Sequence, residues 1–339
     1  MSLHNAEKIR AWAWVPLVIA LSGLCIFPFF ARAYLVEVVM MYFIYIILAQ
    51  SFRLIVTVHD WQLYHFVLYG VGAYTSGMLA KNAGIPVFMA IPLGGAMAAV
   101  MAVVITTPLL RTKGWGFYIA TYGLAELIRL SWLKFRDPFG GSTGIIAIPW
   151  PPVVFGIDFS EGIPYYFFSL AVMLLVLFLL YRIERSHVGD AFKAIAMDSD
   201  LAASTGINIP RHRLLAAAIG RFFAGIAGGL LVHRLSAVDP KLFNLVNMLY
   251  LLIWVVVGGT RTFWGPIIGV SVMHTLFELS RPLIEVRPLF FGLSMVLVLI
   301  FMPGGIEGLI LKAVDRWHRR RDLLTDDSPA VDGKVGVGD

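Results

Sequence analysis

Charged residues inside long apolar stretches are the first candidates for chemistry in this sequence. Glu126 and Arg129 stand three residues apart in a stretch that predicts a helix, so their side chains can pair with each other. Arg221 has no such partner in its own stretch and needs one from elsewhere in the fold. Because a charge in an apolar environment is costly, it is held either by a structural pair or by contact with a substrate or gate. Both interpretations stay open for Glu126 and for Arg221.

Motifs for covalent, nucleotide or metal chemistry are missing from the sequence. There is no G-x-x-x-x-G-K-[ST] phosphate loop, no H-E-x-x-H, no C-x-x-C and no G-x-S-x-G. The single cysteine excludes a cysteine cluster. His59 and His65, the closest pair of histidines, do not share one helical face. We therefore expect no catalytic residue, no metal site and no cofactor in this chain.

The composition is that of a membrane protein. Of the 339 residues 59% are hydrophobic and only 14% are charged, whereas about a quarter of the residues are charged in a soluble domain. Apolar runs of roughly 20 residues, long enough to span a bilayer, recur along the chain. The net charge of +6 comes from basic residues between these runs, without interleaved base-stacking aromatics. This favours a lipid bilayer over nucleic acid as the partner.

The sequence therefore predicts an all-α polytopic membrane protein with about ten (8–10) transmembrane or re-entrant helices. Three of the predicted segments, 62–80, 246–258 and 266–280, are short and carry Gly, Pro or polar residues, so they are candidates for broken or re-entrant helices that line a cavity. The other predicted segments are 12–30, 34–56, 85–110, 114–134, 163–183, 213–236 and 287–310.

The distribution of Lys and Arg predicts the orientation. With the N-terminus inside, inner segments carry roughly twice as many basic residues as outer ones, which places both termini in the cytoplasm. Residues 1–321 are expected to form a single transmembrane domain. The polar tail 322–339 is expected to be a disordered cytoplasmic segment.

The polar segment 184–212 is unusually well ordered for a connection between two spans. Asp190 lies in the first turn of a predicted helix, where it complements the helix dipole. Asp198 is a suitable N-cap for a second short helix, and Gly206 occupies the position where a left-handed residue ends it. The segment thus predicts a capped helix–turn–helix on the cytoplasmic side.

One face of this helix pair is apolar. Val188, Phe192 and Ile195 fall on a single helical stripe. An exposed Phe among alanines suits insertion into a groove of another protein. The alternative is that the stripe packs on the chain's own loops.

Several motifs in order along the chain carry a resemblance to a known family. The segment GDAFKAIAMDSDLAASTGIN resembles the EAA-type cytoplasmic loop of ABC-transporter permeases, which docks on the ATPase subunits. The remaining motifs, which are similar to stretches of branched-chain amino acid permeases of the longer, LivM-like type, are GVGAYTSG, GFYIATYGLAELIRL, FGGSTGI, RHRLLAAAIGRFFAGIAGGLL, VVVGGTRTFWGPIIGV and VRPLFFGLSMVLVLIFMPGGIEGL. Together these motifs cover most of residues 50–310.

The resemblance implies a permease subunit of an ATP-binding-cassette importer in the bacterial plasma (inner) membrane. Its partners would be a second permease subunit in a heterodimer, two ABC ATPase subunits and a periplasmic or extracellular solute-binding protein. ATP would be hydrolysed by the partner subunits, so the chain itself would not be an enzyme. A membrane-embedded enzyme and a passive channel are the alternative classes.

The resemblance also implies two groups of functional residues. ATPase coupling is assigned to Gly189, Phe192, Ala194, Ile195, Asp198, Ala202 and Gly206. The substrate pathway is assigned to Trp61, Tyr64, His65, Glu126, Gly258 and Gly259.

The sequence departs from the family pattern in both groups. Ala196, Met197 and Ser199 stand where the family carries acidic and arginine residues, which indicates a matched, non-standard ATPase partner. The resemblance implies that the solute is a branched-chain amino acid or a similar small molecule. Trp61 and Tyr64 replace small residues of the family pattern, which opens urea or another amide, an aromatic acid or another small carboxylate as alternatives.

Overall fold

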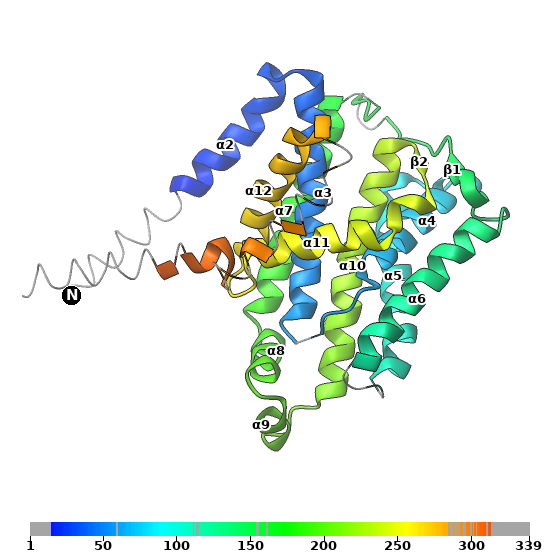
Figure 1. Cartoon of the computed structure of the whole chain (residues 1–339). Helices are drawn as coiled ribbons and strands as arrows, with labels where there is room; N and C mark the ends of the chain where they lie inside the picture. Colours follow the sequence, from blue (N-terminus) through cyan, green and yellow to red (C-terminus); the bar gives the residue numbers. More distant parts are fainter. Residues whose placement is uncertain are drawn as a thin grey trace, which may run out of the picture.

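The computed structural model describes residues 15–312, except for 59, 111, 113–114, 154–155, 161 and several positions between 284 and 310 (Figure 1). The predicted tail 322–339, His59 and much of the predicted segment 287–310 lie outside the described residues. The elements are α2 (Val15–Phe30), α3 (Ala33–Val56), α4 (His65–Asn82), α5 (Val87–Leu109), α6 (Trp115–Lys134), η1 (Gly141–Thr143), β1 (Ile145–Ile146), α7 (Gly162–Glu184), α8 (His187–Met197), α9 (Ser199–Ser204), α10 (Ile209–Leu235), β2 (Ala237–Val238), η2 (Pro240–Phe243), α11 (Leu245–Gly258), α12 (Gly265–Leu279) and η3 (Arg281–Leu283).

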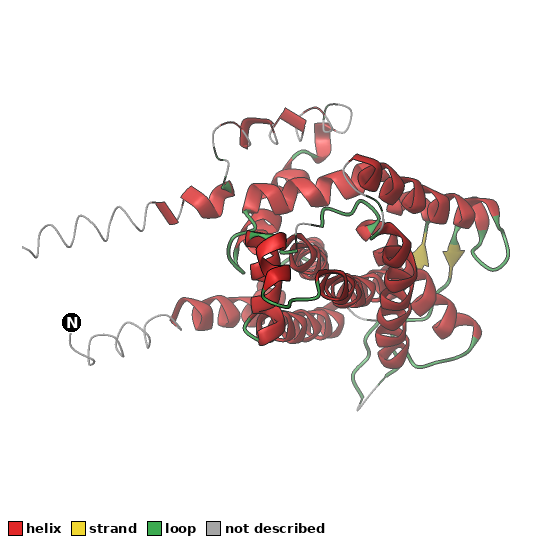
Figure 2. Ribbon diagram, turned by 90° about the horizontal axis from the view of Figure 1, so that it is seen from below, coloured by secondary structure: helices red, strands yellow, loops and turns green. Residues whose placement is uncertain are grey.

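The fold is helical and membrane-spanning, as the sequence predicts. In the described part of the chain four helices, α3, α5, α7 and α10, are long and apolar enough to cross a bilayer. Seen from below, the long helices form a bundle viewed nearly end-on, and α2 extends away from it (Figure 2). The predicted number of about ten segments and the side of the termini stay predictions.

Helix α10 lies at the centre of the bundle and packs on α3, α4 and α5. Glycines allow this close approach: a Cβ on Gly72 of α4 would collide with the backbone of Gly225 on α10, and a Cβ on Gly225 would in turn meet Gly95 of α5. Small residues at helix interfaces are the usual means of bringing membrane helices together, because van der Waals packing drives their association.

Helix α4 differs from the broken helix that segment 62–80 suggests. It runs without interruption from His65 to Asn82, because its glycines serve as contact points with neighbouring helices instead of interrupting the backbone hydrogen bonds. The irregular backbone lies just before the helix, at residues 57–58 and 60–64, where Val58, Asp60, Gln62 and Tyr64 are buried.

Helices α11 and α12 are short, as predicted, and pack against each other. Gly258 and Gly265 meet at the base of the connection, where a Cβ on Gly258 would collide with the carbonyl of Gly265. Gly259 between them has a φ of 105°, which favours glycine. Figure 1 shows α11 crossing the direction of α3 and α10, so this pair forms a hairpin laid against the long helices.

A two-residue strand pair is the β structure of the described chain, and it is a small departure from the all-α prediction. Ile145 pairs with Val238 and Ile146 with Ala237 in antiparallel register. The Nδ1 atom of His233 and the carbonyl of Pro149 also lie 2.8 Å apart. These bonds fix the connection between α6 and α7 to the end of α10.

Candidate functional site: a helix pair, an ion-pair link and an aromatic cavity

Helices α8 and α9 project together from one end of the bundle (Figure 1). Asp198 caps α9 as predicted, because its side chain accepts from the backbone N–H groups of Asp200 and Leu201 at 2.9 and 3.0 Å. Gly206 has a φ of 88°, which confirms the predicted left-handed position at the end of α9. Gly189 lies where a Cβ would collide with the carbonyl of Glu184, so glycine lets α8 turn back closely on α7.

The expectation of an exposed Phe on α8 is wrong. Phe192 is 1% exposed and Ile195 is 2% exposed, and the ring of Phe192 packs edge-on against His212 at 6.3 Å. Ala202 of α9 is buried as well. The stripe therefore holds the helix pair to its own chain, which is the alternative that the pattern left open.

Two apolar side chains on the helix pair face outward instead. Met197 is 89% exposed and Leu201 is 64% exposed. Neither residue was singled out from the sequence for coupling, although Met197 lies off the Phe192 stripe on α8 and Leu201 is the one large apolar residue of α9. We call Met197 and Leu201 the outer apolar pair.

A partly buried ion pair connects the end of α7, just before α8, to the hairpin. Arg53, near the end of α3, donates from Nη1 and Nη2 to the two carboxylate oxygens of Glu184 at 2.8 and 2.9 Å. Its Nε donates to the carbonyl of Thr260, in the connection between α11 and α12, at 3.3 Å. The Arg53 side chain is 3% exposed. The sequence did not predict this link, because Glu184 and Thr260 lie 131 and 207 residues from Arg53 along the chain.

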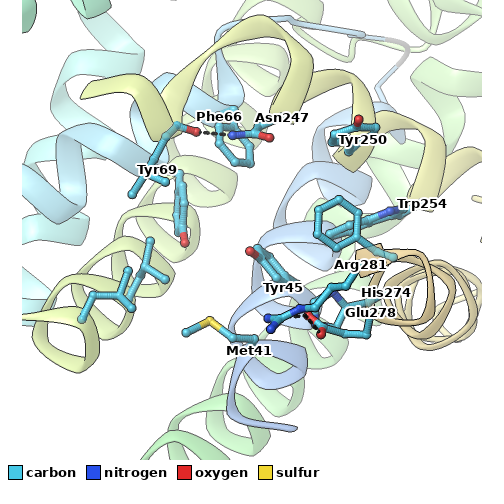
Figure 3. Close-up of a pocket in the computed structure, with 14 residues that line it drawn as sticks. Met41, Tyr45, Phe66, Tyr69, Asn247, Tyr250, Trp254, His274, Glu278 and Arg281 are labelled. Atoms are coloured by element: carbon cyan, nitrogen blue, oxygen red, sulfur yellow. Dashed lines mark hydrogen bonds and ion pairs between the residues drawn. The ribbon is translucent and has the colours of Figure 1, made fainter. Parts of the chain in front are cut away.

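A cavity of about 300 Å³ lies between α3, α4, the end of α10 and the α11–α12 hairpin (Figure 3). Most of its wall is aromatic or aliphatic. The residues that line this aromatic cavity are Met41, Tyr45, Phe66, Tyr69, Leu231, Leu235, Leu242, Asn247, Tyr250, Trp254, His274, Phe277, Glu278 and Arg281.

One end of the aromatic cavity carries an ion pair. Arg281 Nε lies 2.7 Å from a carboxylate oxygen of Glu278. The hydroxyl of Tyr34 donates to the same carboxylate at 2.7 Å, and the Arg281 guanidinium lies over the Tyr34 ring. The hydroxyl groups of Tyr45 and Tyr69 face each other across the space (Figure 3).

The residues predicted for the substrate pathway do not line this cavity. Tyr64 and His65 are fully buried beside α10, and the half-buried Trp61 packs edge-on against Phe52. Glu126 pairs with Arg129, as their spacing predicts. Gly258 and Gly259 form the base of the hairpin instead. A role of any of these residues in the pathway stays a prediction.

Arg221 has its partners in the irregular segment before α4. Its guanidinium donates to the side-chain oxygen of Gln62 and lies 4.6 Å from the centre of the Tyr64 ring. Gln62 donates in turn to Asp60 at 3.2 Å, and the Asp60 carboxylate also acts electrostatically on Arg221. Arg221 is 0% exposed among these partners, which favours the structural interpretation of this residue.

Long apolar helices, a central helix packed through glycines and a capped helix pair at one end define a multi-pass helical membrane protein. The chain belongs to the family of permease components of branched-chain amino acid transport systems, whose profile matches residues 34–303.

Individual relatives agree with this assignment. The chain is 30% identical over 326 residues to the high-affinity branched-chain amino acid transport system permease protein LivM of Salmonella typhimurium, covering 89% of this chain and 76% of that protein. It is 29% identical over 303 residues to LivM of Escherichia coli K12, covering 82% and 71%. A shorter similarity, 30% over 141 residues, links it to LivH of Salmonella typhimurium and covers 41% and 44%. No solved structure matches the chain.

Proposed function

We propose that this chain is a permease subunit of an ATP-binding-cassette importer in the bacterial inner membrane. It forms part of the pathway for a branched-chain amino acid or a similar small solute, and partner ATPase subunits drive it through the segment 186–213. The names of its relatives support the transport role, since LivM and LivH are both permease proteins of branched-chain amino acid transport systems. The resemblance to LivM over most of the chain, and to LivH over part of it, supports assembly with a second permease. An external solute-binding protein completes the proposed importer.

One structural observation carries the coupling part of the proposal. The helix pair α8–α9 is connected through Glu184 and Arg53 to Thr260, and the hairpin that contains Thr260 forms one wall of the aromatic cavity. A displacement of α8 by an ATPase is thereby transmitted through charge-assisted hydrogen bonds to the cavity wall. We call this chain of contacts the Glu184–Arg53–Thr260 link.

The outer apolar pair consists of the large apolar side chains of α8–α9 that are exposed and so available to contact the ATPase. We expect Leu201→Asp to reduce ATP-dependent solute uptake and the ATPase activity that co-purifies with the tagged permease by about tenfold, because the charge enters an apolar contact. Thermal unfolding of the purified chain should not change, since Leu201 is 64% exposed. Uptake is measured in cells or proteoliposomes, and ATP hydrolysis in the purified complex.

Two further variants separate docking from folding. Ala203→Asp adds the same charge to an exposed position of α9 and should leave both activities within about twofold. Phe192→Asp places the charge in the chain's own core and should lower the yield of folded protein instead. Full uptake and full ATPase co-purification with Leu201→Asp would show that α9 is not the docking surface.

A further inference from the structure

The aromatic cavity contains polar atoms that lack partners. Within the described residues, no group donates to or accepts from the Tyr69 hydroxyl, the indole N–H of Trp254 or either ring nitrogen of His274. These three side chains are 1%, 5% and 3% exposed, and all three line the cavity. A buried polar atom without a partner costs about 1–3 kcal/mol. A ligand that supplies the missing hydrogen bonds is therefore favoured over one that only fills the space.

The size of the cavity limits the ligand. A volume of about 300 Å³ is at the lower end of the range for ligand sites. It corresponds to roughly ten water volumes, which suits a molecule of amino-acid size. The walls include the rings of Tyr45, Tyr69 and Trp254, and flat aromatic groups stack or pack edge-on favourably against such rings.

The ion pair at one end suits a head group with both charges. Glu278 and Arg281 together are neutral, so a ligand with a single net charge would leave one of the two less well compensated. A zwitterion can place its carboxylate toward Arg281 and its ammonium toward Glu278. The spare guanidinium N–H groups of Arg281 provide the fork-like donors that a carboxylate binds well.

We propose that the aromatic cavity binds an α-amino acid whose side chain is aromatic and carries a hydrogen-bonding group, namely a phenol, an indole or an imidazole. An aliphatic side chain such as that of leucine would fill the space but leave the polar atoms of Tyr69, Trp254 and His274 unpaired. Sites built around polar groups discriminate strongly against ligands that leave those groups unpaired. The inference rests on the proposed function, because it narrows the similar small solute of that importer to one class.

The test is direct binding to the full-length chain, purified with the subunits that accompany it. L-tyrosine, L-tryptophan, L-phenylalanine and L-leucine are compared by calorimetry or by competition with a radiolabelled amino acid. L-tyrosine should bind at least about tenfold more tightly than L-leucine. Tyr69→Phe should weaken L-tyrosine binding about five- to tenfold and leave L-leucine binding unchanged, because only the hydroxyl is lost. Arg281→Gln should weaken all four ligands, since they share the head group.

Tyr74→Phe is the matched control. Tyr74 belongs to the same helix, is 2% exposed, and its hydroxyl also lacks a partner among the described residues, but it does not line the cavity. Its loss should leave every affinity unchanged. L-leucine binding as tight as L-tyrosine binding, or L-tyrosine affinity insensitive to Tyr69→Phe, would overturn the inference.

The same preparation separates this inference from the proposed function. ATP-dependent uptake of another solute without binding of aromatic amino acids would refute the ligand assignment and leave the importer intact. Binding with the predicted preference but without any ATP-dependent uptake would refute the importer and leave the site standing.

Discussion

Arg221→Met is expected to lower the free energy of unfolding by about 3–5 kcal/mol, the usual cost of removing one partner from a buried charged network. Arg221 is 0% exposed and sits in the middle of α10, where Gln62, Asp60 and Tyr64 surround it. Methionine has a similar length and suits the apolar surroundings. The loss therefore comes from the partners, because the Asp60 carboxylate, which is 5% exposed, loses its favourable interaction with the Arg221 guanidinium.

A double variant isolates this cause. Arg221→Met combined with Asp60→Asn should recover about half or more of the lost stability, because the neutral amide does not depend on the charge of Arg221. Thermal unfolding of the purified chain in detergent measures both variants.

Arg129→Met is the control for the loss of an arginine from a less buried pair. The side chains of Arg129 and Glu126 are 16% and 29% exposed, so the cost should stay within about 1 kcal/mol. If Arg221→Met unfolds at the wild-type temperature, Arg221 is not the anchor of the segment before α4.

Arg53→Met is expected to reduce solute uptake by a factor of about 30 to 150 while the ATPase subunits stay bound. The substitution breaks the Glu184–Arg53–Thr260 link, which joins the end of α7, just before α8, to the α11–α12 hairpin. Losing one partner of a pair whose carboxylate is 20% exposed costs about 2–3 kcal/mol, less than a fully buried pair. This energy corresponds to the expected loss of uptake if the link must stay intact for the permease to change conformation.

Uncoupling distinguishes this result from a loss of assembly. ATP hydrolysis should continue in the purified complex but should no longer respond to the added solute. Arg53→Lys keeps the charge and loses the two-pronged geometry, so an intermediate loss of about tenfold is expected.

Arg185→Met is the matched control for Arg53. Arg185 lies next to Glu184, is exposed, and its guanidinium packs over the Tyr181 ring. Its replacement should leave uptake nearly unchanged. Loss of the ATPase subunits from Arg53→Met would assign Arg53 to the docking surface and would contradict the link.

Local signals in the sequence were enough to define much of the helix pair. Asp198 caps α9 and Gly206 ends it as predicted, because a cap depends on hydrogen bonds to backbone groups two or three residues away. Long apolar runs likewise identified α3, α5, α7 and α10 as membrane-spanning, since the length of a bilayer span is a property of one segment. The pairing of Glu126 with Arg129 was predictable for the same reason.

Tertiary structure alone decided what the polar and apolar faces contact. The Phe192 stripe was visible in the sequence, but a stripe does not reveal whether its partner is the same chain or another one. Arg53 and Arg221 find their partners 131 and 159 residues away, and no local pattern encodes such a pair. The aromatic cavity draws its wall from α3, α4, α10, α11 and α12. Sequence alone thus determined the elements and their caps, whereas the contacts that make a site depended on how distant segments pack.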